Sequence, residues 1–84
     1  MHISIIGVGA MGGAMLEGFL RSDSFSASDI SISNPHTDRL APYAEQGVQV
    51  YADNRKAAAW GDVVFLVVKP WLVESVMEEI SDVL

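Results

Sequence analysis

The stretch Ile3-Ser4-Ile5-Ile6-Gly7-Val8-Gly9-Ala10-Met11-Gly12 decides the fold of this chain. It opens with a short, mostly apolar run that is long enough for a buried strand, and the turn that follows fits the pattern G-x-G-x-x-G. Small and apolar residues then recur at helical spacing, at Met11, Ala14, Met15, Gly18 and Phe19. The sequence therefore predicts a strand, a glycine-rich turn and a helix with one apolar face.

Each glycine of this turn has a physical role in a dinucleotide-binding unit. Gly7 lets the chain turn tightly off the strand, Gly9 has no Cβ to block a pyrophosphate, and Gly12 lets the helix pack close to the strand. The N–H groups at the start of the helix favour phosphate, and no acid precedes Glu17. We therefore expect a dinucleotide to bind here; the alternative is a glycine-rich turn that binds no ligand.

The composition limits the chain to one small domain and excludes several classes of function. The 84 residues carry a formal net charge of −6, which argues against nucleic acid as a partner, because affinity for its phosphates comes from clustered Lys and Arg. The absence of cysteine excludes disulfides, thiolate metal sites and thiol catalysis. We expect no metal site and no catalytic group in this chain, no targeting segment, no membrane span and a cytoplasmic location.

The rest of the chain alternates between strand-like and helix-like segments. Predicted strands cover 30–33, 48–51 and 63–68, and predicted helices run from Thr37 or Asp38 to about Gln46, from Arg55 to Trp60, and onward from Pro70. Pro42 is tolerated only in a first helical turn, so the second helix is expected to be short or to start late. Asp53 is expected to cap the third helix, and the valine-rich run 63–68 to be covered on both faces.

Four β-then-α units with right-handed crossovers predict an α/β fold: a Rossmann-type parallel sheet with helices on both faces and the strand order 3-2-1-4. The expected buried residues of the second helix are Leu40, Tyr43 and Ala44. The last helix carries a predicted apolar stripe of Leu72, Val73, Val76, Met77, Ile80, Val83 and Leu84. Because the outer edge of 63–68 has no predicted neighbour, we expect the chain to be the N-terminal part of a longer protein or to need a partner.

The end of the second predicted strand bears on the choice of nucleotide. Sheets that bind NAD usually place Asp or Glu about 20 residues beyond the glycines, where this chain has Ser33-Asn34. Ser and Asn can donate to a 2′-phosphate that a carboxylate would repel, and His36 and Arg39 follow closely. We expect NADP(H) to be preferred, with NAD(H) open as the other cofactor. The alternative is that Asn34-Pro35 is turn chemistry and Arg39 a solvated side chain.

Two further segments follow predicted strands, and the carboxyl ends of parallel strands face the ligand crevice in such sheets. Asn54 comes after the third strand, and its amide can hydrogen-bond a ribose hydroxyl. The fourth strand ends in Val67, Val68, Lys69 and Pro70, where backbone groups can approach the ribose and nicotinamide. On composition alone, Lys69 is more often a snorkelling surface lysine and Pro70 a helix start.

These segments together resemble the N-terminal domain of pyrroline-5-carboxylate reductase. The resemblance rests on Ile6-Gly7-Val8-Gly9-Ala10-Met11-Gly12-Gly13-Ala14-Met15, Ser33-Asn34-Pro35, Asp53-Asn54, and the run from Asp62 to Pro70 that ends in Val-Lys-Pro. It covers essentially the whole chain, and the combination is more specific than the glycine motif alone. The resemblance implies a reductase that takes hydride from NADPH or NADH and converts 1-pyrroline-5-carboxylate to L-proline, in proline synthesis.

The resemblance also implies roles for individual residues. Those that cradle the pyrophosphate would be Ile6, Gly7, Val8, Gly9, Ala10 and Met11. Ser33 and Asn34 would face the adenosine ribose and its 2′-phosphate, and Asn54 would meet a ribose. Residues 67–70 would border the nicotinamide side. Many members have a basic residue where this chain has Pro35, and this departure weakens the preference for NADP.

Residues 1–84 would then be an NAD(P)-binding domain that lacks the family's C-terminal helical domain, where the substrate pocket and the dimer interface mainly lie. We expect this chain alone to bind cofactor without turnover, and the full-length protein to be a homo-oligomer acting on an imino acid. One alternative is a stand-alone, non-catalytic NAD(P)-binding module. Another is the cofactor half of a coenzyme F420-dependent NADP reductase or a β-hydroxyacid dehydrogenase, against which the Val-Lys-Pro segment argues.

Overall fold

Strands and helices alternate along the chain, which a computed structural model describes for residues 1–7, 9–34 and 37–84. The strands are β1 (Ile3–Ile6), β2 (Ile30–Ser33), β3 (Gln49–Tyr51) and β4 (Val63–Leu66). The α-helices are α1 (Ala10–Arg21), α2 (Ala41–Glu45), α3 (Asn54–Trp60) and α4 (Val73–Ile80). Short 3-10 helices complete the order: η1 (Ala27–Asp29), η2 (Thr37–Leu40), η3 (Pro70–Leu72) and η4 (Ser81–Val83).

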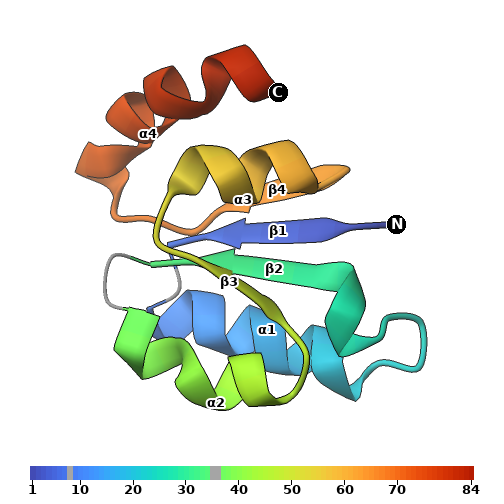
Figure 1. Ribbon diagram of the computed structural model, residues 1–84. Helices are drawn as coiled ribbons and strands as arrows, with labels where there is room; N and C mark the ends of the chain where they lie inside the picture. The colour runs from blue at the N-terminus through green and yellow to red at the C-terminus, as the bar shows by residue number, and fades with distance from the viewer. Residues whose placement is uncertain (8, 35–36) are drawn as a thin grey trace.

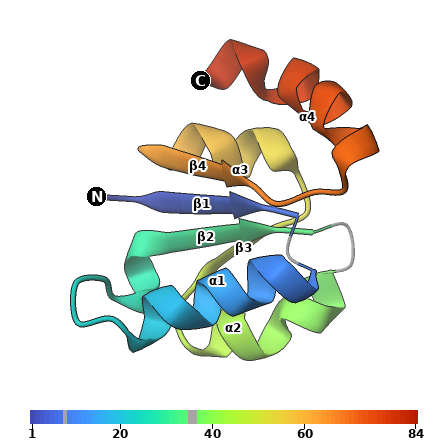
Figure 2. The same ribbon diagram turned by 180° about the vertical axis from the view of Figure 1, so that it is seen from behind.

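The strands form one parallel sheet in the order β3-β2-β1-β4. β1 lies between β2 and β4, with Ile3 opposite Ile30 on one side and opposite Val63 on the other. Helices α1 and α2 cover one face of the sheet and α3 and α4 cover the other, as Figure 1 and the reverse view in Figure 2 show. The predicted fold class and strand order are confirmed.

Two apolar clusters lie on opposite faces of the sheet, because successive side chains of a strand point to opposite sides. The cluster on the α1–α2 face consists of Ile3, Ile5, Leu16, Ile30, Ile32, Leu40 and Val48. The cluster on the α3–α4 face consists of Ile6, Ala58, Val76 and Ile80.

On the α3 face, β1 and β2 carry serines in place of large side chains. Ser4, Ser31 and Ser33 are fully buried. The Ser4 hydroxyl lies 2.7 Å from that of Ser31 and donates to the carbonyl oxygen of Ala57 in α3 at 2.5 Å. These small side chains let α3 lie close to the sheet: a Cβ built on Gly61, just after α3, would stand 2.2 Å from Ser4 Oγ.

The buried face of α1 matches the predicted one at Met15 and Phe19, which pack against the cluster on the α1–α2 face, and differs from it elsewhere. Leu16 is fully buried and Phe19 packs against the same cluster, whereas Ala14 and Gly18 are exposed. The prediction counted small residues as apolar and omitted Leu16. Positions three and four apart share a helix face, so the large side chains at 16 and 19, and not the small ones at 14 and 18, determine which face meets the sheet.

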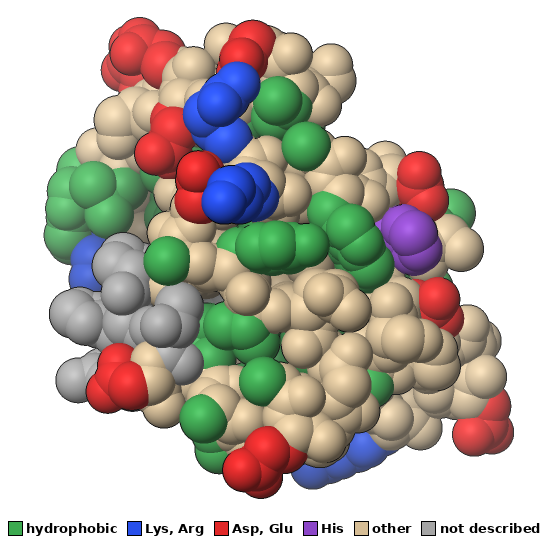
Figure 3. Space-filling model, in the orientation of Figure 1, with side chains coloured by type: hydrophobic (Ala, Val, Ile, Leu, Met, Phe, Trp, Pro, Cys, Tyr) green, Lys and Arg blue, Asp and Glu red, His purple; other side chains and the backbone are tan. Residues whose placement is uncertain are grey.

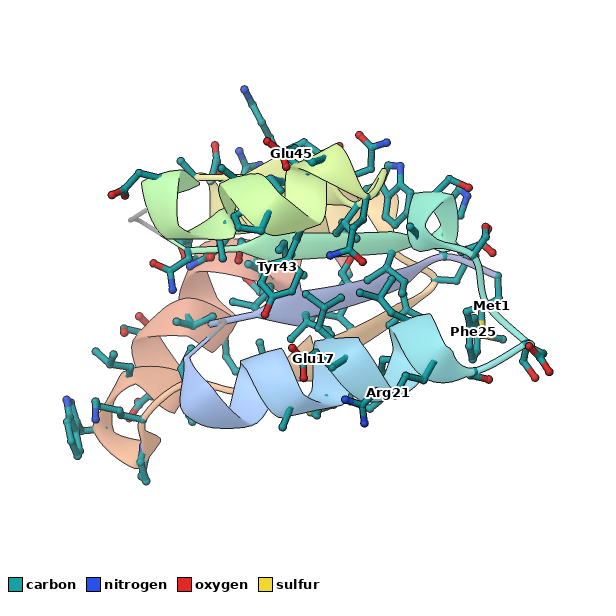
Figure 4. All side chains as sticks on the ribbon, turned by 90° about the horizontal axis from the view of Figure 1, so that it is seen from below. Met1, Glu17, Arg21, Phe25, Tyr43 and Glu45 are labelled. Carbon is teal, nitrogen blue, oxygen red and sulfur yellow. The ribbon has the colours of Figure 1, made fainter. Side chains whose placement is uncertain are left out.

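The second helix starts late, as Pro42 predicted. The 3-10 helix η2 comes first, and the proline lies in the first turn of α2. Leu40 is buried and Tyr43 is half-buried, but Ala44 is exposed, so its predicted burial is wrong. A five-residue helix presents little more than one turn to the rest of the domain. Tyr43 points from α2 toward α1, where Glu17 lies (Figure 4).

The fourth strand is shorter than predicted and covers Val63–Leu66 instead of 63–68. Val63 is exposed and the remaining strand residues are half-buried. Both faces of the strand are nevertheless covered, as predicted, because Phe65 packs against the cluster on the α1–α2 face and Val64 and Leu66 against the cluster on the α3–α4 face. β4 lies at the edge of the sheet, where one side has no strand neighbour among the described residues. Val67 leaves the ladder but still donates its N–H to the Ile6 carbonyl at 2.8 Å.

The last helix buries only part of its predicted stripe. Val76 and Ile80 are buried, whereas four other members are exposed: Leu72, Val73, Met77 and Leu84. The apolar stripe is wider than the surface of α3 and β4 against which it packs. The residues at the edges of the stripe therefore remain exposed to solvent. Trp71, just before the stripe, is 72% exposed.

The turn after β1 depends on Gly7, whose φ of +89° lies in the left-handed region. A Cβ at this position would lie 2.5 Å from Val68 Cγ1 and 2.8 Å from the Val67 carbonyl oxygen. Both the backbone conformation and the lack of space therefore require glycine.

We expect Gly7→Ala to lower the free energy of unfolding by about 2 kcal/mol or more, because backbone strain and overpacking act together. The matched control is Gly18→Ala in α1, where a Cβ would meet no atom within 4 Å. That change should raise stability by about 0.5–1 kcal/mol, since alanine favours a helix interior. Urea unfolding of both variants measures the difference, and equal stability of the two would contradict the role of Gly7.

Candidate functional site

The glycine turn lies at the carboxyl edge of the sheet, between the ends of β2 and β4. Gly7 donates its N–H to the Ser33 carbonyl at 3.2 Å, and Gly9 donates to the Gly7 carbonyl at 2.9 Å. A Cβ on Gly12 would lie 2.9 Å from the Gly7 oxygen, so the start of α1 packs directly against the turn. The roles that the sequence predicts for Gly7 and Gly12, a tight turn and close packing, are confirmed.

Gly9 faces open space. It is exposed, and a Cβ built on it would meet no atom within 4 Å among the described residues beyond its chain neighbours. It occupies the N-cap position of α1, where no side chain caps the helix and the first turn contains no acid. The first N–H groups of a helix have no partner within the helix, and the helix dipole is positive there. The space beside Gly9 can therefore accept an anion.

Two hollows meet at this edge of the sheet. The first, which we name the Asn54 groove, has a volume of about 460 Å³ and is lined by Gly7, Gly9, Ser33, Asn34, Asn54, Val67, Val68, Lys69, Leu72 and Val76. The second, the Met15 recess, has a volume of about 490 Å³ and is lined by Gly9, Met15, Phe65, Leu66, Val67, Val68 and Lys69. They share Gly9 and residues 67–69, so an extended ligand lying over the turn could reach both.

The polar end of the Asn54 groove is formed where β2 and β3 end. Ser33 closes β2, Asn34 donates its N–H to the Tyr51 carbonyl of β3 at 3.2 Å, and Asn54 opens α3. Asp53 caps α3 by accepting the N–H of Arg55 at 2.8 Å, as predicted. The structure thus brings together the residues that the sequence selected from separate segments.

The hydroxyl of Ser33 does not reach the surface. The side chain is fully buried and donates to Oδ1 of Asn54 at 2.7 Å. Donation to a 2′-phosphate, expected for Ser33, would need this bond to break. Asn54 in turn donates from Nδ2 to Oε1 of Glu79 in α4 at 2.8 Å.

The segment after β4 contributes mainly its backbone and two valines. Val67 and Val68 are half-buried and line both hollows. Lys69 is exposed, with Nζ 5.4 Å from the centre of the Trp71 ring. Pro70 is exposed and begins η3, as the sequence predicted for a helix start.

Several predicted site positions fall outside the described part of the chain. Val8 lies outside the described residues, as do Pro35 and His36. The side chains of Ala10, Met11 and Arg39 also lie outside the described part. Their expected contacts with pyrophosphate or 2′-phosphate stay predictions.

Other residues of the site were not predicted as such. Leu72 and Val76 line the Asn54 groove, and Met15 and Phe65 line the Met15 recess. Their apolar periodicity marks them only as core residues. Glu79 carries no local signal, because its contact with Asn54 joins residues 25 positions apart.

An ion pair ties the start of α3 to the end of the chain. Arg55 donates from Nε to Asp82 at 3.2 Å, and its Nη2 also contacts that carboxylate. Figure 3 shows basic and acidic side chains next to one another over α3. The hydrogen bond from Arg55 lowers the pKa of Asp82, and the same bond raises the pKa of Arg55.

The described residues hold neither a metal-ligand cluster nor a membrane-spanning helix. They contain no group of three or more His, Cys, Asp or Glu that could hold a metal ion. Residues 1–7, 9–34 and 37–84 also include no helix with the length and apolar character needed to cross a bilayer.

Comparison with known proteins gives consistent matches. The model of the family described as NADP oxidoreductase coenzyme F420-dependent matches residues 2–84. Pyrroline-5-carboxylate reductase 3 of Danio rerio is 34% identical over 81 residues, which are 96% of this chain and 28% of that protein. The structure of a pyrroline-5-carboxylate reductase from Coxiella burnetii superimposes with a TM-score of 0.87 at 34% identity, covering 99% of this chain and 31% of that one.

A reductive aminase from Aspergillus terreus, solved in complex with NADPH and ethyl-5-oxohexanoate, superimposes with a TM-score of 0.76 at 26% identity. The match covers 92% of this chain and 26% of the aminase. This chain therefore spans less than a third of the length of each of these three relatives.

We expect Asp82→Asn to lower the urea midpoint at pH 7, since it removes the acceptor of Arg55. Because the folded-state pKa of Asp82 is lowered, the pair stabilises the fold above the ordinary aspartate pKa, about 3.9, and this contribution is lost as the pH falls through the lower folded value. The difference in urea midpoint between wild type and Asp82→Asn should therefore be smaller at pH 3 than at pH 7. Asp23→Asn, in the loop after α1, controls for the loss of one negative charge; a gap of the same size at both pH values contradicts the assignment.

Proposed function

We propose that this chain, which belongs to the family of coenzyme F420-dependent NADP oxidoreductases, is the nicotinamide-dinucleotide-binding domain of a pyrroline-5-carboxylate reductase. Such an enzyme transfers hydride from NAD(P)H to the imine of 1-pyrroline-5-carboxylate and forms L-proline. Two similar proteins, from Danio rerio and Coxiella burnetii, carry that enzyme's name, and they match nearly the whole of this chain.

The observation that carries the proposal is the open face of Gly9 at an uncapped helix N-terminus. A pyrophosphate there would meet backbone N–H groups and the positive end of the α1 dipole, and Gly9 itself carries no side chain to block it. The cradle would comprise Ile6, Gly7, Val8, Gly9, Ala10, Met11 and Gly12. The left-handed Gly7 turns the chain so that this end of α1 lies beside both hollows.

The adenosine half of the cofactor would lie in the Asn54 groove, beside Asn34 and Asn54 and above Ser33. The nicotinamide half would lie against residues 67–70, next to the Met15 recess. We propose NADP(H) in preference to NAD(H), because the end of β2 carries no carboxylate to repel a 2′-phosphate. The Aspergillus terreus aminase, described with NADPH, is in keeping with this choice.

When bound, the cofactor supplies the hydride. The residues of this chain bind and orient it: glycines hold the pyrophosphate and amides hold the ribose. The similar reductases are more than three times as long as these 84 residues. We therefore propose that other parts of the full-length protein form the substrate pocket, the proton-transfer groups and a homo-oligomeric interface. A cytoplasmic location is part of the same proposal.

Two alternative functions of this chain predict different experimental results. The family description supports a second candidate, an enzyme that passes hydride between NADP and coenzyme F420. A stand-alone module that binds the nucleotide without chemistry is the other. All three share the dinucleotide site, so cofactor binding tests the site and turnover separates the functions.

For binding, we expect NADPH to bind more tightly than NADH when each is titrated and followed by its own fluorescence. Gly9→Ala should weaken the affinity for each nucleotide by about tenfold or more, because its methyl group would occupy space needed by the pyrophosphate. Its stability should fall by only about 1 kcal/mol, the preference of an N-cap for glycine over alanine, since a Cβ there meets no atom of the described residues within 4 Å.

Gly18→Ala, on the exposed side of α1, is the matched control and should bind as wild type does. Equal affinity for the two nucleotides would overturn the NADP preference. Failure of the wild-type protein to bind either would overturn the dinucleotide site itself.

For turnover, we expect the longer protein of which this chain is the proposed domain to consume NADPH when given 1-pyrroline-5-carboxylate. The absorbance of reduced nicotinamide measures the rate. The 84-residue chain alone should give none, because it contributes only the cofactor site. Reduction of coenzyme F420 instead of the imine would favour the second candidate, and cofactor binding with neither reaction would favour the module.

A further inference from the structure

The amide of Asn54 is held from two sides by residues of different elements. Ser33, at the end of β2, donates its hydroxyl hydrogen to Asn54 Oδ1 at 2.7 Å. Glu79, in α4, accepts from Asn54 Nδ2 at 2.8 Å. Asn54 itself is the first residue of α3 and lines the Asn54 groove. One side chain of the groove is thus braced by a strand and a helix at once.

The brace fixes which way the amide points. A carboxylate only accepts hydrogen bonds, so the NH₂ group of Asn54 must face Glu79. Its carbonyl oxygen then faces Ser33, whose hydroxyl can donate. An amide flipped by 180° would place oxygen against the carboxylate and repel it. Glu79 therefore decides the orientation and Ser33 completes it.

These two hydrogen bonds use only part of the hydrogen-bonding capacity of the Asn54 amide. An asparagine amide has two N–H donors and two acceptor sites on its oxygen. One donor goes to Glu79 and one acceptor site to Ser33. One N–H and one lone pair remain for a ligand in the groove, and a hydroxyl group, which both donates and accepts, can use both.

We propose that Ser33 and Glu79 are positioning residues that set the Asn54 amide to bind a ribose hydroxyl of the adenosine half of the cofactor. This inference rests on the proposed function and extends it to two residues that need not touch the cofactor. The negative charge of Glu79 behind the amide favours a neutral hydroxyl over a phosphate at this point. Asn54 therefore recognises ribose, and the 2′-phosphate of NADP lies elsewhere along the groove.

The test compares NADPH affinities of matched variants. Glu79→Ala and Ser33→Ala should each weaken binding about fivefold, the effect of one hydrogen bond lost or misdirected. Glu78→Ala removes the same charge from the neighbouring position of α4, and Ser31→Ala makes the same change at another fully buried serine of β2. Both controls should bind within about twofold of wild type. Glu79→Gln keeps an acceptor for Nδ2 and should restore most of the affinity.

A second readout distinguishes recognition of a hydroxyl from a general loss of structure. Wild-type protein should bind ADP more tightly than 3′-deoxy-ADP, because the 3′-hydroxyl is the hydroxyl that NADP leaves free on its adenosine ribose. In Glu79→Ala that preference should largely disappear, because the amide no longer presents its donor and acceptor in place. A variant with loosened structure would bind both nucleotides more weakly and keep the preference.

The outcomes separate this inference from the function on which it rests. If wild type binds NADPH but Glu79→Ala and Ser33→Ala match their controls, the positioning role is overturned and the dinucleotide site stands. If wild type binds neither NADPH nor NADH, both are overturned. Glu79 is exposed, so its variant remains informative even where Ser33→Ala unfolds.

Discussion

The close approach of three backbone segments around Gly7 is the constraint on which the rest of the site depends. The end of β1, the start of α1 and the chain after β4 meet there without room for a side chain: a Cβ on Gly7 would lie 2.8 Å from the Val67 oxygen, and one on Gly12 would lie 2.9 Å from the Gly7 oxygen. This packing fixes the N-terminus of α1 at the carboxyl edge of the sheet. The candidate site is therefore defined first by backbone, and only then by side chains.

The serines of β1 and β2 extend this arrangement to the groove. Ser4 bonds to the backbone of α3, and Ser33 bonds to the first side chain of the same helix. Small residues on this face bring α3 close enough for Asn54 to project beside the glycine turn. The same row of residues thus serves the packing of the sheet at one end and the geometry of the groove at the other.

Local pattern was enough to predict the architecture and most of the residues that line the two hollows. Strand alternation, the glycine spacing and Asp53 as a cap depend on neighbours in sequence, and the rule that parallel strands end at one edge brought Ser33, Asn34 and Asn54 together. The predictions that failed concern features that are set by tertiary contacts. The burial of Leu16, the length of β4 and the exposure of Met77 are set by which surface each meets. The contact of Glu79 with Asn54 joins distant segments, and no local pattern encodes it.

The acidity of the chain, with a formal charge of −6, conflicts with an anionic ligand only if charge is counted over the whole surface. Exposed charges are screened over about 8–10 Å in physiological salt, whereas N–H groups at a helix terminus act by direct contact. Around the groove, Lys69 is exposed and lies over Trp71, and Glu79 lies behind Asn54. Affinity for a dinucleotide would thus come from fixed dipoles, whose effect depends on how closely the phosphates approach Gly9. A single methyl group at that position should matter more than several changes of charge elsewhere on the surface.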